Sequence, residues 1–454
     1  MKYIKYISVL VLLIVMAAVA VPVSAQLGDT DTSSFTVQNV SGGTANITVV
    51  FYAENGTTYQ PADLGGGTTN PFALADGASK QIVVSNIPVA QLPSGRYSVV
   101  ISSDALVVAQ AGLAGSGTRH FNGSYISSTI GATTVYIPSV AYNFYGWYST
   151  ITVQNLGSSP ANVTVTFNCL GGGTGTLTQN GIPSMASYTW ALKDVVPTGF
   201  TTGTICDGSA VVTSGQAIAA VNNQNQPSTG ATNTFEGAIS GGNPLYAPNV
   251  SNNYFGWNSN LTIMKLSAGN TTVTVSYSDG DPDDICNLTD AAPACKLYQP
   301  SYHSVAGRYG ATMTATGGAQ LLALVGSTNG SLSGATSAAA SGTAEVAIPN
   351  AAKNYYGWGS AINCQVVGGA ATTLHVSYSG YAGSAYDTAS LGIGNSIQII
   401  VNNEGFLPSS WQGGVSVTAN TPAAMIACTV GNSNPSGAVA QPGDWTTQYN
   451  AYNK

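Results

Sequence analysis

The segment Asn143-Phe144-Tyr145-Gly146-Trp147 occurs in three copies along the chain. The other copies are Asn253-Tyr254-Phe255-Gly256-Trp257 and Asn354-Tyr355-Tyr356-Gly357-Trp358, so that successive tryptophans lie 110 and 101 residues apart. Each copy also has a proline nine residues before its Trp. Fixed offsets of this kind predict tandem structural repeats of about 105 residues each.

A segment of alternating apolar and polar residues begins sixteen residues after each Trp. Its apolar positions are Val163, Val165 and Phe167, then Val273, Val275 and Tyr277, then Leu374, Val376 and Tyr378. Alternation with period two predicts a strand with one buried face. Gly-rich turns, several short strands per repeat and hardly any helical periodicity favour an antiparallel β-sandwich.

A fourth, earlier repeat is incomplete. Val37-Gln38-Asn39 matches Val153-Gln154-Asn155, but no aromatic-Gly-Trp element precedes it. We therefore expect an all-β chain of four tandem antiparallel β-sandwich (immunoglobulin-like) domains after a signal peptide. The expected bounds are 1–25 for the signal peptide, 26–140 for the first repeat with its degenerate start, 141–250 for the second, 251–351 for the third and 352–454 for the fourth.

The N-terminus predicts export. Lys2 and Lys5 precede an apolar run over 7–21, and Val23-Ser24-Ala25 places small residues where a signal peptidase cleaves. The alternative is an uncleaved anchor helix. No later apolar stretch is long enough to span a membrane. We expect a secreted protein, located in the extracellular medium or on the cell surface.

Composition excludes several classes of protein. Charged residues make up only 6% of the chain, and the formal net charge is −7. Nucleic-acid binding needs a basic surface that this chain lacks. The three histidines, His120, His303 and His375, are scattered among few acidic residues, so the sequence shows no catalytic constellation. We expect a protein that is not an enzyme and has no catalytic or cofactor-binding residues.

The six cysteines predict a disulfide framework. Only one of the fifteen possible connectivities keeps every pair inside one repeat. It joins Cys169 to Cys206, Cys286 to Cys295 and Cys364 to Cys428. We expect the last pair, with its long separation, to connect two sheets through an immunoglobulin-like core. Such bonds belong to an oxidising compartment.

One acidic cluster suggests a metal site. Asp279, Asp281, Asp283 and Asp290 follow the spacing of a calcium-binding loop, since Ca²⁺ takes several carboxylate and carbonyl oxygens. The match is partial, because Asp284 stands where such a loop needs glycine. The alternative is a solvated hairpin tip held by the nearby cysteines.

The repeated aromatic residues allow two interpretations. The elements lie between the last strand of one repeat and the first of the next, where a domain junction needs apolar packing. We therefore expect Trp147, Trp257 and Trp358 to pack between domains. The alternative is that the aromatic rings form a platform for glycans.

The chain resembles the tandem immunoglobulin-like repeats of secreted bacterial cell-surface proteins. The resemblance rests on the aromatic-Gly-Trp element, the Val-Gln-Asn strand and turns such as Val196-Pro197-Thr198-Gly199, and it covers most of residues 27–454. It implies an exported, modular surface or matrix protein and supplies no catalytic residue.

We expect a non-enzymatic extracellular structural protein, a rod of repeats that assembles into a surface fibre, sheath or layer. Its partners would be further copies of itself or other surface-layer components, because faces rich in Ser, Thr, Asn and Gly repel one another weakly. The alternative is an adhesin or glycan-binding cell-surface stalk. A secreted hydrolase ranks third, because the sequence shows no carboxylate pair on a shared scaffold.

Overall fold

The alternating segments form strands that bury their apolar side chains between two sheets. On β12 (Ala161–Cys169), Val163, Val165 and Phe167 are buried, while the residues between them are not. The computed structural model describes residues 15–20, 30–116, 119–128, 130–441 and 443–454. In this part of the chain the sheets are antiparallel and helices are few and short, so the all-β prediction is confirmed.

Each repeat has a first sheet, which in the second, third and fourth repeats contains the strand preceding the aromatic-Gly-Trp element. In the first repeat, the order in this sheet is β1 (Val15–Ala20), β7 (Tyr97–Ser103), β3 (Ala45–Ala53) and β4 (Thr58–Tyr59), with β5 (Phe72–Leu74) also on β3; in the second it is β10 (Ala132–Tyr142), the first part of β15 (Cys206–Asn225), β12 and β13 (Thr174–Ile182). In the third repeat the order is β17 (Leu245–Asn252), β22 (Gly307–Ala315), β19 (Thr271–Tyr277) and β20 (Asp284–Leu288). In the fourth it is β33 (Tyr452–Asn453), β25 (Glu345–Lys353), β30 (Trp411–Ala419), β27 (Leu374–Tyr378) and β28 (Tyr386–Asp387).

A second sheet completes each sandwich. In the first repeat, the order in this sheet is β6 (Ser79–Val83), β2 (Thr30–Asn39), β8 (Val107–Ser116) and β9 (Phe121–Ile126); in the second it is β14 (Ser187–Ala191), β11 (Tyr148–Asn155), the second part of β15 and β16 (Thr232–Glu236). In the third repeat the order is β21 (Ala294–Tyr298), β18 (Asn258–Lys265), β23 (Leu321–Asn329) and β24 (Leu332–Ser337). In the fourth it is β29 (Ser396–Ile400), β26 (Gly359–Gly368), β31 (Met425–Ser433) and β32 (Thr446–Asn450).

Short helical segments connect some of the strands. They are α1 (Gln299–Tyr302) and α2 (Pro435–Ala440), with 3-10 turns at Val84–Asn86, Thr316–Gly318, Ala382–Ser384 and Val401–Asn403.

Each sandwich has its own core, and the strand before the aromatic-Gly-Trp element belongs to the core that follows it. On β10, Val135 and Ile137 pack with Val163 and Phe167 of the second repeat. The expected boundaries after residues 140, 250 and 351 therefore fall inside β10, β17 and β25. We assign each of these strands to the repeat that follows the expected boundary.

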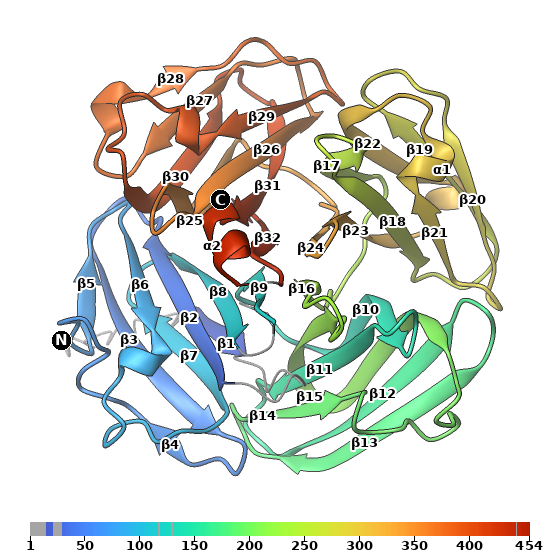
Figure 1. Ribbon diagram of the computed structural model, residues 1–454, viewed down its shortest axis with the longest axis horizontal. Helices are drawn as coiled ribbons and strands as arrows, with labels where there is room; N and C mark the ends of the chain where they lie inside the picture. Colours follow the sequence, from blue (N-terminus) through green and yellow to red (C-terminus); the bar gives the residue numbers. More distant parts are fainter. Residues whose placement is uncertain (1–14, 21–29, 117–118, 129, 442) are drawn as a thin grey trace, which may run out of the picture.

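The four sandwiches form a ring, so the expectation of a rod is wrong (Figure 1). The first strand of each repeat packs on the second sheet of the next: β10 contacts β18 and β23, β17 contacts β26 and β31, and β25 contacts β2 and β8. The last contact joins the fourth repeat back to the first. Head-to-tail contacts build a ring when the rotation per repeat closes and an open filament when it does not. Motif spacing does not specify that rotation.

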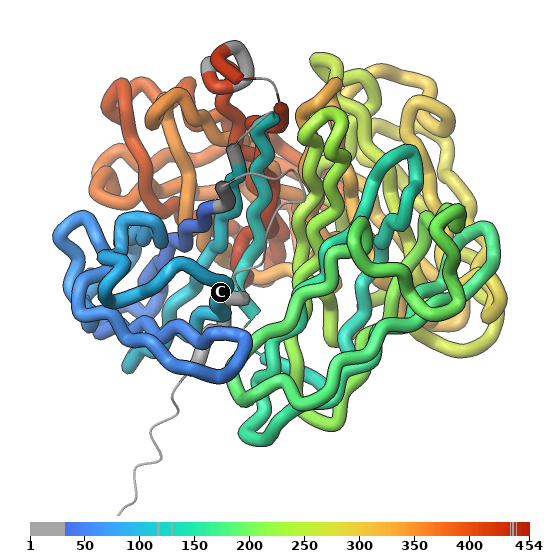
Figure 2. Tube along the Cα trace, turned by 60° about the horizontal axis from the view of Figure 1, so that its bottom comes forward, coloured from blue at the N-terminus to red at the C-terminus, as the bar shows by residue number. Residues whose placement is uncertain are grey.

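The last strands of the second sheets line the centre of the ring. In the order β9, β16, β24 and β32 each contacts the next, and β32 contacts β9. Figure 1 shows these strands around the centre, and Figure 2 shows the ring in a tilted view. Glycine permits this close approach at two positions. A Cβ atom on Gly123 would lie 2.0 Å from Oγ1 of Thr234, and one on Gly334 would lie 2.6 Å from the Gln448 side chain. The penultimate strand β32 therefore lies at the ring centre.

The six cysteines form the three disulfides expected from the sequence, but the Cys364–Cys428 bond connects different elements than expected. Cys364 and Cys428 are directly opposite each other on β26 and β31, so this bond lies within one sheet and does not join two sheets. The chain passes through the other sheet between them, which explains their long separation. Cys286 and Cys295 instead connect β20 and β21, the edge strands of the two sheets of the third repeat.

Most of the predicted signal peptide lies outside the described residues. Its described part, Val15–Ala20, is β1, which pairs with β7 as β10, β17 and β25 pair with the matching strands of the other repeats. None of the helices in the described ranges is long and apolar enough to cross a membrane.

Candidate functional site

Asp444 connects all four repeats at the centre of the ring. Its backbone N–H donates to the carbonyl of His120 at 2.8 Å, and its own carbonyl accepts from the Asn122 side chain at 2.9 Å, both in the first repeat. Its carboxylate accepts from the backbone N–H groups of Thr232 in the second repeat (2.9 Å), Ser333 in the third (3.1 Å) and Thr446 in the fourth (3.0 Å).

The carboxyl group of Asp444 is shielded from bulk solvent. Asp444 is fully buried, and burial raises its pKa well above the ordinary value of 3.8, while the three N–H donors act in the opposite direction. Removing the carboxyl group would leave buried N–H groups of three repeats without an acceptor. Asp444 therefore links the four repeats to one another at the centre of the ring.

Each aromatic-Gly-Trp element is a tight turn closed by an isolated antiparallel bridge, and it links a strand of the first sheet to a strand of the second sheet. In the first copy the N–H of Trp147 donates to the carbonyl of Phe144 at 2.9 Å, and Tyr145 (φ 48°) and Gly146 (φ 76°) both take left-handed conformations. Positive φ at both central residues is characteristic of a type I′ turn. The other two copies have the same hydrogen bond and the same signs of φ.

The first aromatic residue of a turn lies at the junction with the next repeat. The ring of Phe144 lies 5.5 Å from Nζ of Lys296 in the third repeat, and Lys296 also forms an ion pair with Asp207 of the second. The hydroxyl of Tyr254 donates to Oε1 of Gln398 in the fourth repeat at 3.4 Å. The expected junction packing thus involves the first aromatic position of the motif.

The tryptophans themselves are only partly buried. Trp147, Trp257 and Trp358 do not belong to the buried cores. Trp358 lies 6.3 Å from Trp445 of its own repeat, measured between ring centroids. Whether these three rings stabilise the junctions stays a prediction.

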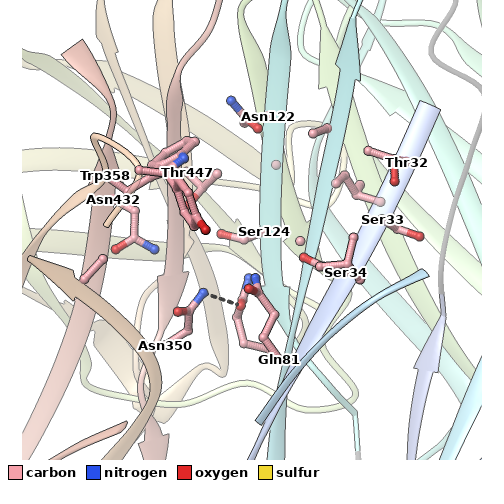
Figure 3. A pocket seen from close by; sticks show the side chains of 18 of the residues that line it. Thr32, Ser33, Ser34, Gln81, Asn122, Ser124, Asn350, Trp358, Asn432 and Thr447 are labelled. Atoms are coloured by element: carbon pink, nitrogen blue, oxygen red, sulfur yellow. Dashed lines mark hydrogen bonds between the residues drawn. The ribbon is translucent and has the colours of Figure 1, made fainter. Parts of the chain in front are cut away.

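A pocket of about 330 Å³ lies between the fourth repeat and the first (Figure 3). One wall comes from β2, β6, β8 and β9, and the other from β25, β30, β31, β32 and the third aromatic-Gly-Trp turn. Among the residues that the structure describes, no Asp, Glu, Lys or Arg lines it. The lining residues with amide or hydroxyl side chains, other than tyrosine, are Thr32, Ser33, Ser34, Gln81, Gln110, Asn122, Ser124, Asn350, Gln412, Asn432 and Thr447.

Amide side chains bridge the two walls of the pocket. Nδ2 of Asn350 donates to Oε1 of Gln110 at 3.2 Å across the junction (Figure 3). Oδ1 of Asn350 accepts from Nε2 of Gln412 at 2.8 Å. This chain of amides fixes the spacing of the walls.

Aromatic residues line the same pocket. Tyr355, Tyr356, Trp358 and Trp445 contribute from the fourth repeat, and the Trp445 ring stacks on His120 at 3.6 Å between centroids. Burial lowers the pKa of His120, which favours the neutral imidazole. Both ring nitrogens of His120 are buried, and within the described residues neither meets the geometry of a hydrogen bond.

The four aspartates of the predicted calcium site separate into two groups. Asp279 lies 2.7 Å from Nε2 of His303, and Asp281 accepts from the N–H and hydroxyl of Ser304 at 2.9 and 2.7 Å. Asp290 pairs with Lys265 instead. Asp283, the fourth expected ligand, is exposed. No group of three or more His, Cys, Asp or Glu residues in the described ranges could hold a metal ion. A calcium site here stays a prediction.

Sequence reasoning missed the pocket because its walls come from opposite ends of the chain. Ser34 and Gln81 on one side meet Asn432 and Thr447 on the other only because the ring closes. One signal in the sequence pointed to this pocket: the third aromatic-Gly-Trp element, which lies beside the first repeat once the ring is closed.

Comparisons with known proteins give little further information. No protein-family model matches the chain, and no curated protein is similar to it in sequence. A solved structure described as a tetra-tandem repeat in the extending region of a large adhesion protein is similar over 97% of this chain and 99% of that chain, with 10% sequence identity and a TM-score of 0.12. At that TM-score the similarity carries no argument about function.

Proposed function

We propose that this chain is an exported, non-catalytic binding protein that takes a neutral saccharide into the pocket between its first and fourth repeats. The observation that supports this most is the lining, whose described residues combine amides, hydroxyls and aromatic rings and include no Asp, Glu, Lys or Arg. Saccharide hydroxyls pair with amides and hydroxyls, and the C–H faces of sugar rings pack on aromatic rings.

Size and charge point to the same ligand class. A volume of about 330 Å³ is at the lower end of the range for small-molecule sites, which suits one or two sugar residues. A phosphate or carboxylate ligand would lack a cationic partner in this lining. Hydrolysis of a glycoside uses two carboxyl groups beside the bond, so the lining supports binding without cleavage.

The export signal and the three disulfides support an extracellular location. The protein would meet its ligand outside the cell or at its surface, in the role of an adhesin.

Glycan-array screening followed by calorimetry with the best neutral oligosaccharide tests this function. Gln81→Ala should weaken binding at least tenfold, because Gln81 lines the pocket on β6. Gln398→Ala is the matched control, because Gln398 has the corresponding position on β29 at a different junction. Equal loss in both variants, or no binding by the wild-type protein, would refute the proposed function.

Assembly into a fibre, sheath or layer is a second candidate, supported by one observation. Cleavage after Ala25 would remove β1 and leave the edge of β7 unpaired. An open strand edge can accept a strand from another chain. Electron micrographs of a chain that begins at Gln26 would show filaments or sheets if this candidate is right, and single particles if it is wrong.

A further inference from the structure

The second aromatic residue of each turn projects into solvent. Tyr145, Phe255 and Tyr356 are 81%, 83% and 83% exposed, and all three have positive φ, between 48° and 50°. They occupy the first central position of the type I′ turns. We call these three residues the tip aromatics.

An aromatic residue is an unfavourable choice at this position. Type I′ turns strongly prefer Asn, Asp or Gly where φ is positive, and a bulky side chain there is strained. Burial does not offset the strain, because the rings are more than four-fifths exposed. The sequence nevertheless places Tyr or Phe at all three tips, which suggests that these rings serve a purpose other than turn formation.

The tips are held in place by their surroundings. Each tip ring lies 4.7 Å, edge to face, from the aromatic residue before it. The carbonyl groups of Tyr145, Phe255 and Tyr356 accept hydrogen bonds at 2.8, 3.1 and 3.0 Å, respectively. Their donors are the side-chain amides of Gln226, Asn329 and Asn434. Binding through such rigid tips would cost little conformational entropy.

The ring places the three tips on the same face of the molecule. Contacts between successive repeats are head-to-tail and close on themselves, so the repeats are related by rotation about one axis. Equivalent turns then lie at the same height along that axis. Tyr356 also lines the saccharide pocket, so the tip face includes an edge of that pocket.

We infer that the tip aromatics form a platform that binds a neutral polysaccharide, each ring stacking on a different sugar residue or strand of the polymer. This inference rests on the proposed saccharide function and extends it from a single unit in the pocket to a polymer surface. The low charge of the chain, 6% of residues, matches an uncharged polymer and gives no basic patch for anionic lipids.

Multivalency gives the platform its strength. A single exposed ring binds a sugar weakly, but rings fixed on one scaffold bind a polymer with a combined strength well above that of one contact. Loss of two of the three tips should therefore reduce retention on a polymer at least tenfold and leave pocket binding of a short oligosaccharide unchanged.

The test uses the double variant Tyr145→Asn and Phe255→Asn, which leaves Tyr356 and the pocket intact. Asn-Gly suits a type I′ turn, so the variant should melt at or above the wild-type temperature, and misfolding cannot explain a loss of binding. Retention is measured on insoluble cellulose and chitin particles. Tyr302→Asn is the control, because Tyr302 is 50% exposed but lies outside the turns.

The expected result is a retention at least tenfold lower for the double variant, with wild-type retention for Tyr302→Asn. Wild-type retention by the double variant would overturn the platform. The platform would also be overturned if the wild-type protein bound phosphatidylcholine vesicles and neither cellulose nor chitin. If retention depended on the tip aromatics but no oligosaccharide bound, saccharide binding in the pocket would be refuted while polymer binding by the tip aromatics would be supported. The two failures are therefore distinguishable.

Discussion

The carboxylate of Asp444 accepts a hydrogen bond from the backbone amide of Thr232, although 212 residues separate them in the sequence. The same carboxylate oxygen accepts from Ser333, and the second oxygen accepts from Thr446. One side chain near the C-terminus thus joins three inner strands, and its backbone joins the fourth. Asp444 therefore lies at the point where all four repeats meet.

Asp444→Ala should destabilise the folded protein by at least about 3 kcal/mol, because each buried N–H left without an acceptor costs about 1–3 kcal/mol. Denaturant unfolding followed by tryptophan fluorescence measures the change. The control Asp283→Asn, at an exposed position, should have almost no effect. A similarly small loss in Asp444→Ala would contradict the role of this carboxylate.

Asp444 should also make stability depend on pH. Its folded pKa is raised, so the folded protein holds the proton to a higher pH than the unfolded chain does. The contribution of this group is therefore full below the unfolded value of about 3.8 and is lost as pH rises through the folded value. Relative to Asp444→Asn, the wild-type protein should lose stability between about pH 4 and the folded pKa. A difference that stays constant over this range would disprove the shift.

Trp257→Ala should lower stability by at most about 3 kcal/mol, less than for a fully buried tryptophan, because the ring is only partly buried. The substitution Phe255→Asn, two residues before Trp257, should cause no loss of stability. Thermal unfolding of both variants separates the packing role of the Trp from the exposed tip. Equal destabilisation by the two substitutions would show that the tip ring is also part of the packing.

Calcium should raise the melting temperature little or not at all. An ion would have to displace His303 from Asp279 and Ser304 from Asp281, and Asp290 is held by Lys265. Melting curves with millimolar calcium, and with magnesium as control, test this. A rise of several degrees with calcium alone would show that the aspartates rearrange around the ion, as the sequence spacing predicts.

The sequence was sufficient for local structure because the determinants are local. Alternation at Val163, Val165 and Phe167 depends only on the period of a strand, and the in-repeat pairing of Cys169 with Cys206 depends only on repeat spacing. The course of the Cys364–Cys428 bond was not predictable, because it depends on which strands become neighbours within a sheet.

Closure of the ring was not predictable for a different reason. The rotation between repeats is set by junction contacts such as Phe144 with Lys296, and a small change in that angle separates a ring from a rod. The pocket and the central position of Asp444 both follow from closure, so neither could be derived from motif spacing.

Small-angle X-ray scattering of the purified protein tests the central claim, head-to-tail closure of the four repeats. A compact chain of this length should have a radius of gyration of about 22 Å and a single-peaked pair-distance distribution. We expect that result at neutral pH and low protein concentration. A clearly larger radius with the long tail of an elongated particle would show an open row of domains, and the shared pocket, the central role of Asp444 and the common face of the tip aromatics would all be wrong.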